Sequence, residues 1–249
     1  MSGSANSLAD GMLNYLEHEE IAIDNLTVIG CDGCPVNTGI NGGVIRIIEE
    51  KINRPLQRFV CLLHANELPL RHLFFHLDGV TQGPRAFAGS IGKLLSRNVE
   101  LLPVIEYDII EFESTDQNFV ISDLSTDQKL LLQMCQGISN GCITPELANQ
   151  TPGPVCHSRW LTLAIRILRL YVSTENPSDN LKTLTTFIMR VYAPTWFSIK
   201  SRPSCVYGTM HFFKMVQSTK YLPQNLKILF IQFCNETHFL LMSKMLSWL

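Results

Sequence analysis

A strand–helix–strand–helix pattern over residues 26–77 constrains the fold of this 249-residue chain more than any other stretch. One apolar, β-branched run predicts a strand that ends in Cys31-Asp32-Gly33, and a second run predicts a strand over residues 58–63. Between them, an apolar stripe with charged residues opposite predicts a helix over residues 43–52. Two strands joined by a short helical crossover form a βαβ unit, so we expect them to be parallel and buried on both faces.

The sequence after residue 100 is mainly helical in pattern. Ser125 with Gln128 forms a capping box, and residues 158–171 are amphipathic. A further helix should be capped by Ser178 or Asp179 and be broken by Pro194.

These patterns predict three regions. Residues 1–20 are expected to form an N-terminal arm, residues 21–100 an α/β core, and residues 101–249 a mainly helical region.

Composition limits the classes of partner. The formal net charge is −2, so no overall basic field draws the chain onto nucleic acid or an anionic membrane. No apolar run reaches the roughly 18 uncharged residues that a membrane helix needs, which predicts a protein without a membrane segment. The eight cysteines are scattered and no secretory leader precedes them, which predicts reduced thiols in an intracellular protein, nuclear or cytoplasmic.

Asp32 is the first candidate functional residue, because it stands at the end of a predicted strand between Gly30 and Gly33. Open α/β sheets place their ligands at the carboxyl ends of parallel strands. A carboxylate there can hold a divalent metal through its hard oxygen atoms. The alternative is structural, since Asp-Gly is also a common turn-forming pair.

Cysteine and histidine residues follow both predicted strands. A structural zinc site commonly uses two pairs of ligands, each pair separated by a few residues. Cys31 and Cys34 have the spacing of one such pair, and Cys61 and His64 have the spacing of the other. If the strands are parallel neighbours, these four side chains could converge on one zinc ion. The alternative is two pairs of structural residues, with His64 beginning the next helix. A thioredoxin-like function is disfavoured, because that motif opens a helix and this one precedes a Gly-rich turn.

Three arginines recur on one side of the amphipathic segment near residue 160. Arg159, Arg166 and Arg169 could contact the phosphates of a nucleic acid, or they could form a solvated basic face.

Several of these motifs together resemble a known family. The runs CDGCPVNTGINGGVIR (residues 31–46), RPLQRFVCLLHANELPLRHLFFHLDG (residues 54–79) and SRWLTLAIRILRLYV (residues 158–172) are similar to those of transposon-derived invertebrate proteins. The family more distantly resembles the hAT-type transposases. Their ribonuclease-H-like core has an Asp after its fourth strand, a Cys-x-x-His segment at its fifth, and an Arg-Trp at the start of a helix in a helical insertion.

The resemblance implies DNA cleavage and strand transfer by two metal ions, Mg²⁺ or Mn²⁺, held by two aspartates and a glutamate. Only Asp32 matches one of these acids. The residues before Ile21 are too few to contain the first strands with the first acid, and Glu236 is the only glutamate after Glu175. The resemblance also implies that Trp160 is a structural residue.

We therefore expect an α/β plus α fold: a partial ribonuclease-H-like parallel or mixed sheet followed by a helical insertion region. We expect no catalysis and no cofactor, with Mg²⁺ or Mn²⁺ needed only if activity survives and zinc only if the cysteine set binds it. The expected function is binding of a nucleic acid, DNA or RNA, or of a protein partner. The alternatives are a metal-dependent nuclease fragment that uses Asp32, a helical interaction module that forms homo-oligomers, and a decayed fragment without function.

Overall fold

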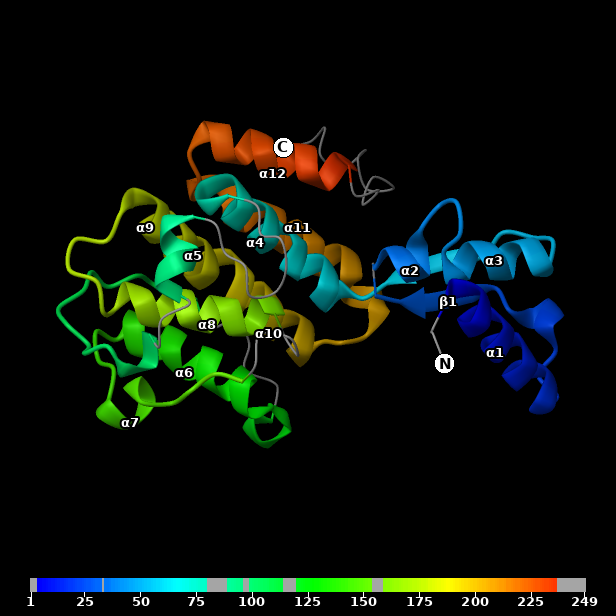
Figure 1. Cartoon of the computed structure of the whole chain (residues 1–249), viewed down its shortest axis with the longest axis horizontal. Coiled ribbons are helices and arrows are strands. Elements are labelled where there is room, and N and C mark those ends of the chain that lie inside the picture. Colours follow the sequence, from blue (N-terminus) through cyan, green and yellow to red (C-terminus); the bar gives the residue numbers. More distant parts are fainter. Residues whose placement is uncertain are drawn as a thin grey trace. The chain divides into compact units, whose positions relative to one another are not determined.

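The computed structural model describes residues 4–32, 34–79, 89–95, 99–113, 120–153 and 159–236. The chain is mainly helical with a small parallel sheet, and it divides after Ala65 into two compact units (Figure 1). The division comes earlier than the predicted boundary near residue 100. One reason is that Asn66 already belongs with the later helices, since its side-chain amide donates to the carbonyl of Tyr192 at 3.0 Å.

The first unit contains the predicted pair of parallel strands. The register runs from Val28 opposite Gln57 to Cys31 opposite Val60, which confirms the parallel arrangement. The helix expected between the strands is also present. The elements of this unit are α1 (Ala5–His18), η1 (Ile23–Asn25), β1 (Val28–Cys31), α2 (Pro35–Thr38), α3 (Val44–Lys51) and β2 (Gln57–Val60).

The prediction that residues 1–20 form a separate arm is wrong. Ser4 caps helix α1, because its hydroxyl accepts from the backbone N–H of Ser7, and the helix packs against α3. Ala9 of α1 is fully buried, because α1 packs on the apolar stripe of α3 and removes it from water. The core of the unit consists of Ala9, Val44, Ile47, Ile48 and Leu56.

The prediction that the first strand is buried on both faces is also wrong. Burial alternates along β1: Val28 is 50% exposed, whereas Ile29 packs against the core. Such alternation is typical of a sheet with helices of its own unit on one face only. The residues before β1, which have a strand-like sequence, form the 3₁₀ turn η1 instead.

The second unit is a bundle of helices. It contains α4 (Leu62–Asp78, of which residues from Asn66 onward belong here), α5 (Ser90–Leu95), η2 (Val99–Leu101), η3 (Ile121–Asp123), α6 (Thr126–Ser139), α7 (Pro145–Ala148), α8 (Arg159–Tyr171), α9 (Asp179–Phe187), η4 (Ile188–Tyr192), α10 (Ala193–Ser201), η5 (Cys205–Tyr207), α11 (Gly208–Ser218), η6 (Thr219–Tyr221) and α12 (Gln224–Glu236). Helix α8 packs against both α6 and α9 (Figure 1).

The predicted helix starts are confirmed in this unit. Ser125 and Gln128 form the capping box of α6, each side chain accepting from the other residue's backbone N–H. The hydroxyl of Ser178 accepts from the N–H of Leu181 and caps α9. These caps use N–H groups that a helix leaves without an intrahelical partner.

Pro194 does not break the helix, contrary to the prediction. Residues Ile188–Tyr192 form a π-helical turn (η4) that joins α9 to α10 without interruption, and Pro194 falls in the first turn of α10. A proline has no N–H to donate, and its ring crowds the carbonyl four residues earlier. The π-helical turn is wider than an α-helical one, and it changes which backbone groups pair just before Pro194. The extra residue also rotates the side chains of α10 relative to those of α9.

An extended segment over residues 103–113 crosses α6 and α8. Its backbone is held by Ile105, which donates to the carbonyl of Val172 at 3.0 Å, and by Phe112, which donates to the hydroxyl of Ser139 at 3.1 Å. Within the described residues, none of the helices has the length and apolarity to cross a membrane.

Candidate functional site

Asp32 lies at the carboxyl end of β1, as predicted, and closes a local turn. Its Oδ1 accepts from the backbone N–H of Cys34 at 3.2 Å and from the side-chain amide of Asn37 at 2.7 Å. A hydrogen bond from the Cys34 side chain lowers the pKa of Asp32, with smaller contributions from the other donors and from nearby His64. Asp32 is therefore ionised at neutral pH, with one oxygen engaged in the turn.

The strand ends bring part of the cysteine set together. The N–H of Cys61 donates to the carbonyl of Cys31 at 2.9 Å, so these residues are neighbours across the sheet. Partial burial and the negative charge of Asp32 raise the pKa of the Cys31 and Cys34 thiols, whereas zinc requires thiolates. Among the residues that the structure describes, no group of three or more His, Cys, Asp or Glu side chains is arranged to hold a metal ion.

The arginines of α8 make internal contacts. Arg169 is 4% exposed, and its guanidinium donates to the carbonyls of Ala148 (2.9 Å) and Leu102 (2.5 Å) and to the hydroxyl of Ser173. Arg166 is half-buried and donates to the carbonyl of Gly153 at 3.1 Å. Arg169 is thus a structural residue rather than the predicted phosphate contact. The side chain of Arg159 lies outside the described residues.

Trp160 is buried at 8% exposure, and its ring meets that of Phe75 edge to face at a centroid distance of 5.8 Å. This contact ties α8 to α4, which fits a packing role for the tryptophan.

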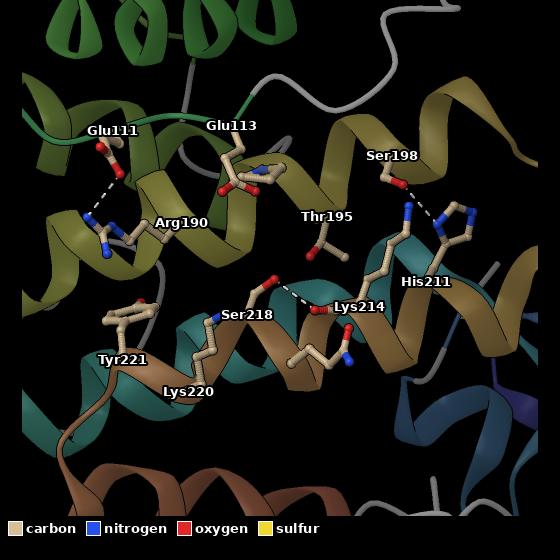
Figure 2. Close-up of a pocket in the computed structure, with 12 residues that line it drawn as sticks. Glu111, Glu113, Arg190, Thr195, Ser198, His211, Lys214, Ser218, Lys220 and Tyr221 are labelled. Carbon is tan, nitrogen blue, oxygen red and sulfur yellow. Dashed lines mark hydrogen bonds and ion pairs between the residues drawn. The ribbon is translucent and has the colours of Figure 1, made fainter. Parts of the chain in front are cut away.

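A cavity of about 360 Å³ in the second unit gathers polar side chains (Figure 2). Sites for small ligands begin at about this volume. The lining residues come from the extended segment, η4, α10, α11 and η6, and they are Glu111, Glu113, Arg190, Pro194, Thr195, Ser198, His211, Lys214, Gln217, Ser218, Lys220 and Tyr221.

The local helix geometry explains why these residues share one cavity. His211, Lys214 and Ser218 recur at intervals of three and four along α11, so they lie on one face of that helix. Facing them, Arg190 belongs to the π-helical turn and Ser198 to α10. Turns of this kind are frequent at functional sites.

One end of the cavity is closed by a buried hydrogen-bonded pair. Ser198 Oγ lies 3.2 Å from His211 Nδ1, and His211 Nε2 lies 3.0 Å from the carbonyl of Arg202. A carbonyl only accepts, so Nε2 carries a proton, and in the neutral ring Nδ1 accepts from the Ser198 hydroxyl. Ser198 is in the middle of α10, where backbone N–H groups are used within the helix and cannot form an oxyanion hole. The pair therefore links α10 to α11.

The remaining cavity wall is suited to an anion. Arg190, Lys214 and Lys220 are cationic and exposed. The Tyr221 hydroxyl is buried without a hydrogen-bond partner among the described residues, and burial raises the pKa of this phenol, so it stays protonated and can donate. Arg190 also lies over the Tyr221 ring at 5.6 Å and forms an ion pair with Glu111 at 3.6 Å.

The sequence contains a signal for this site that the net charge conceals. Residues 190–235 contain no Asp or Glu and six basic residues: Arg190, Lys200, Arg202, Lys214, Lys220 and Lys227. Residues 100–127 contain eight Asp and Glu and no Lys or Arg. The charges of the two segments nearly cancel in the net charge of the chain. Only the separation of basic and acidic residues along the sequence could have indicated a basic site.

Comparison of the chain with protein-family models gave no match, and neither the curated proteins nor the solved structures compared with it proved similar. Inference about function therefore starts from the chemistry of the cavity.

Proposed function

We propose that this chain binds nucleic acid through backbone phosphates, at the cavity between α10 and α11, and does not cleave it. The observation that carries the proposal is the meeting of Arg190, Lys214 and Lys220 at one cavity, in a stretch of the chain without acidic residues. Phosphate contacts by lysine and arginine dominate the affinity of proteins for nucleic acids.

The donors around these cations suit phosphate oxygens. Thr195 lines the same cavity with a hydroxyl group, and the unpartnered Tyr221 hydroxyl is a further donor (Figure 2). The Ser218 hydroxyl already donates to the carbonyl of Lys214 at 2.7 Å. Hydroxyl and basic side chains are the usual partners of nucleic-acid phosphates. Beyond the cavity, Lys200 and Arg202 add positive charge at the end of α10, so a polymer would find more cations than a single phosphate could.

The absence of cleavage is part of the proposal. The parallel pair β1–β2, with Asp32 at its carboxyl end, is compatible with a partial ribonuclease-H-like core of transposon origin. A two-metal mechanism needs several carboxylates around the ions, and Asp32 is the one acid that the resemblance assigns. The alternative is a nuclease fragment, in which Mg²⁺ or Mn²⁺ would bind at Asp32.

A second candidate function is protein binding through α1. Leu8, Met12 and Tyr15 lie on one side of this helix and are 40%, 46% and 62% exposed. An exposed apolar stripe is typical of an interaction surface, including one between two copies of a chain. Sedimentation of the protein at increasing concentration tests this function: self-association that is lost in Met12→Glu supports it, and a monomer at every concentration excludes the homo-oligomer.

Fluorescence anisotropy with a labelled 12-nucleotide single strand tests the principal proposal. Binding should weaken steeply as the salt concentration rises. Each phosphate contact on a single strand contributes roughly 0.7 to the slope of log K against log salt, so the double variant Lys214→Ala/Lys220→Ala should reduce the magnitude of that slope by about 1.4. The matched control is Lys129→Ala/Lys182→Ala, which removes two lysines of the same unit that do not line the cavity.

Two results would contradict the proposal. Equal loss of slope in both double variants would mean that binding depends on overall charge rather than on this cavity. Metal-dependent nicking of a labelled duplex that disappears in Asp32→Ala would establish the nuclease function instead.

A further inference from the structure

Glu113 is unexpected in a cavity that otherwise suits phosphate. The cavity has a second acid, Glu111, whose carboxylate forms an ion pair with Arg190 at 3.6 Å. Glu113 also lines the cavity, and no hydrogen bond or ion pair links its carboxylate to another described residue. Figure 2 shows its side chain directed from the extended segment toward the space between Arg190 and Thr195. The side chain is exposed, so water hydrates it in the free protein. Beside a bound strand, a carboxylate at this place repels phosphate and can accept a hydrogen bond from a hydroxyl of the ligand.

The extended segment holds Glu113 at this position. The preceding residue, Phe112, donates its N–H to the Ser139 hydroxyl, and Tyr171 donates its hydroxyl to the carbonyl of Asp108 at 3.0 Å. Two anchors within six residues limit how far the carboxylate can move away when a ligand enters.

The cations lie on both sides of this carboxylate. Arg190 and Lys220 line one part of the cavity and Lys214 another, with the hydroxyls of Thr195 and Ser218 between them (Figure 2). Successive phosphates bound at the two groups of cations would place a sugar between them, facing Glu113. A ribose there offers a 2′-hydroxyl as a donor, whereas a deoxyribose within a strand has no hydroxyl.

We infer that the cavity selects RNA over DNA and that Glu113 is the residue that determines this choice, by accepting a hydrogen bond from a 2′-hydroxyl. The inference rests on the proposed function, because it assumes that the sugar–phosphate backbone occupies the cavity. For DNA, the same carboxylate stays unpaired next to phosphates, which costs affinity through repulsion and loss of hydration.

Three single strands of equal length and base sequence test the inference: oligo-U, oligo-dU and 2′-O-methyl oligo-U. The whole chain should bind oligo-U about fivefold more tightly than the other two strands, the typical value of one net hydrogen bond. The 2′-O-methyl strand retains the ribose shape but lacks the hydroxyl proton, so it separates hydrogen bonding from sugar conformation.

Glu113→Ala should bring the ratio of the three affinities close to one, mainly by strengthening the binding of oligo-dU. The matched control is Glu106→Ala, which removes the same charge from the same extended segment at a residue that does not line the cavity. The control should change all three affinities little and equally, and leave their ratio unchanged.

The outcomes distinguish the inference from the function on which it rests. Equal binding of all three strands by the unsubstituted chain overturns the selection of RNA and leaves phosphate binding intact. A ratio that changes as much in Glu106→Ala as in Glu113→Ala also overturns it. If no strand binds, the proposed function itself is wrong.

Discussion

Glu67 on helix α4 should make the second unit less stable as the pH rises. Burial raises the pKa of Glu67 to about 7 from an ordinary value of 4.5. In the window between these values the folded chain holds a proton that the unfolded chain has lost. The free energy of unfolding therefore falls as the pH increases through this window, and the loss is complete above pH 7.

The size of this effect follows from the two pKa values. A difference of about 2.5 corresponds to about 3.4 kcal/mol at 1.36 kcal/mol for each pKa unit. Glu67 retains some access to solvent, so we expect about 2 kcal/mol between pH 4.5 and pH 8. The buried hydroxyl of Tyr192 is close enough for the Glu67 charge to raise the pKa of that tyrosine, and it has no hydrogen-bond partner among the described residues.

Urea unfolding followed by tryptophan fluorescence measures the effect in the relevant unit, because all three tryptophans occur after residue 159. Glu67→Gln keeps the shape of the side chain but cannot ionise. In this variant, the difference between the unfolding free energies at pH 5 and pH 8 should be about 2 kcal/mol smaller than in the unsubstituted chain. It should also be more stable than the unsubstituted chain at pH 8.

Glu146→Gln provides the matched control. This carboxylate is fully exposed at the start of α7, where the backbone N–H of its own residue and the Thr144 hydroxyl lower its pKa. It is mostly ionised from pH 5 to pH 8 in both folded and unfolded states, so its removal should leave the pH dependence nearly unchanged. A Glu67→Gln variant with the same pH dependence as the unsubstituted chain would refute the argument from burial.

Three further substitutions test structural roles, each by urea unfolding with the same fluorescence signal. Arg169→Leu should lower the unfolding free energy by about 3–5 kcal/mol, because it leaves buried carbonyls without their donor; a loss below 1 kcal/mol would mean that this arginine is dispensable. Asp78→Ala should cost about 1–2 kcal/mol, since its carboxylate accepts from the N–H groups of Ile91 and Gly92 at 2.7 Å each and caps α5; Asp78→Asn should lose less. Trp160→Ala should lower the unfolding free energy by about 3–5 kcal/mol, and Trp160→Phe should lower it clearly less, because phenylalanine retains a ring in the same space. Equal losses in the two variants would contradict a packing role.

Local signals in the sequence predicted local structure well. The parallel strands and the helix between them followed from apolar periodicity, and the start of α6 followed from Ser125 and Gln128. Such features depend on residues within a few positions of one another, and the chemistry of a cap is the same in any fold. Asp32 was likewise expected at a strand end, where the structure has it.

Features that depend on distant contacts were not predictable in this way. Arg169 has the spacing of a surface residue, but its guanidinium satisfies carbonyls from two other segments, 21 and 67 residues away in sequence. Burial of Ala9 depends on α3, which the sequence of α1 does not specify. Pro194 is a breaker in an ordinary helix, and only the π-helical turn before it lets the chain continue.

The cavity illustrates how a nearly neutral chain can gather three cations at one place, where two carboxylates of the acidic segment also lie. Eight acids in residues 100–127 and six cations in residues 190–235 almost cancel over the whole molecule, yet salt limits the reach of each charge to about 8–10 Å. A ligand at Lys214 therefore experiences the charges that line its own cavity and little of the overall balance. The carboxylates of Glu111 and Glu113 are within that cavity, so they contribute to affinity directly, whereas Glu106 contributes mainly to the net charge. This difference in position is why substitutions of equal charge on one segment should have unequal effects on the choice of ligand.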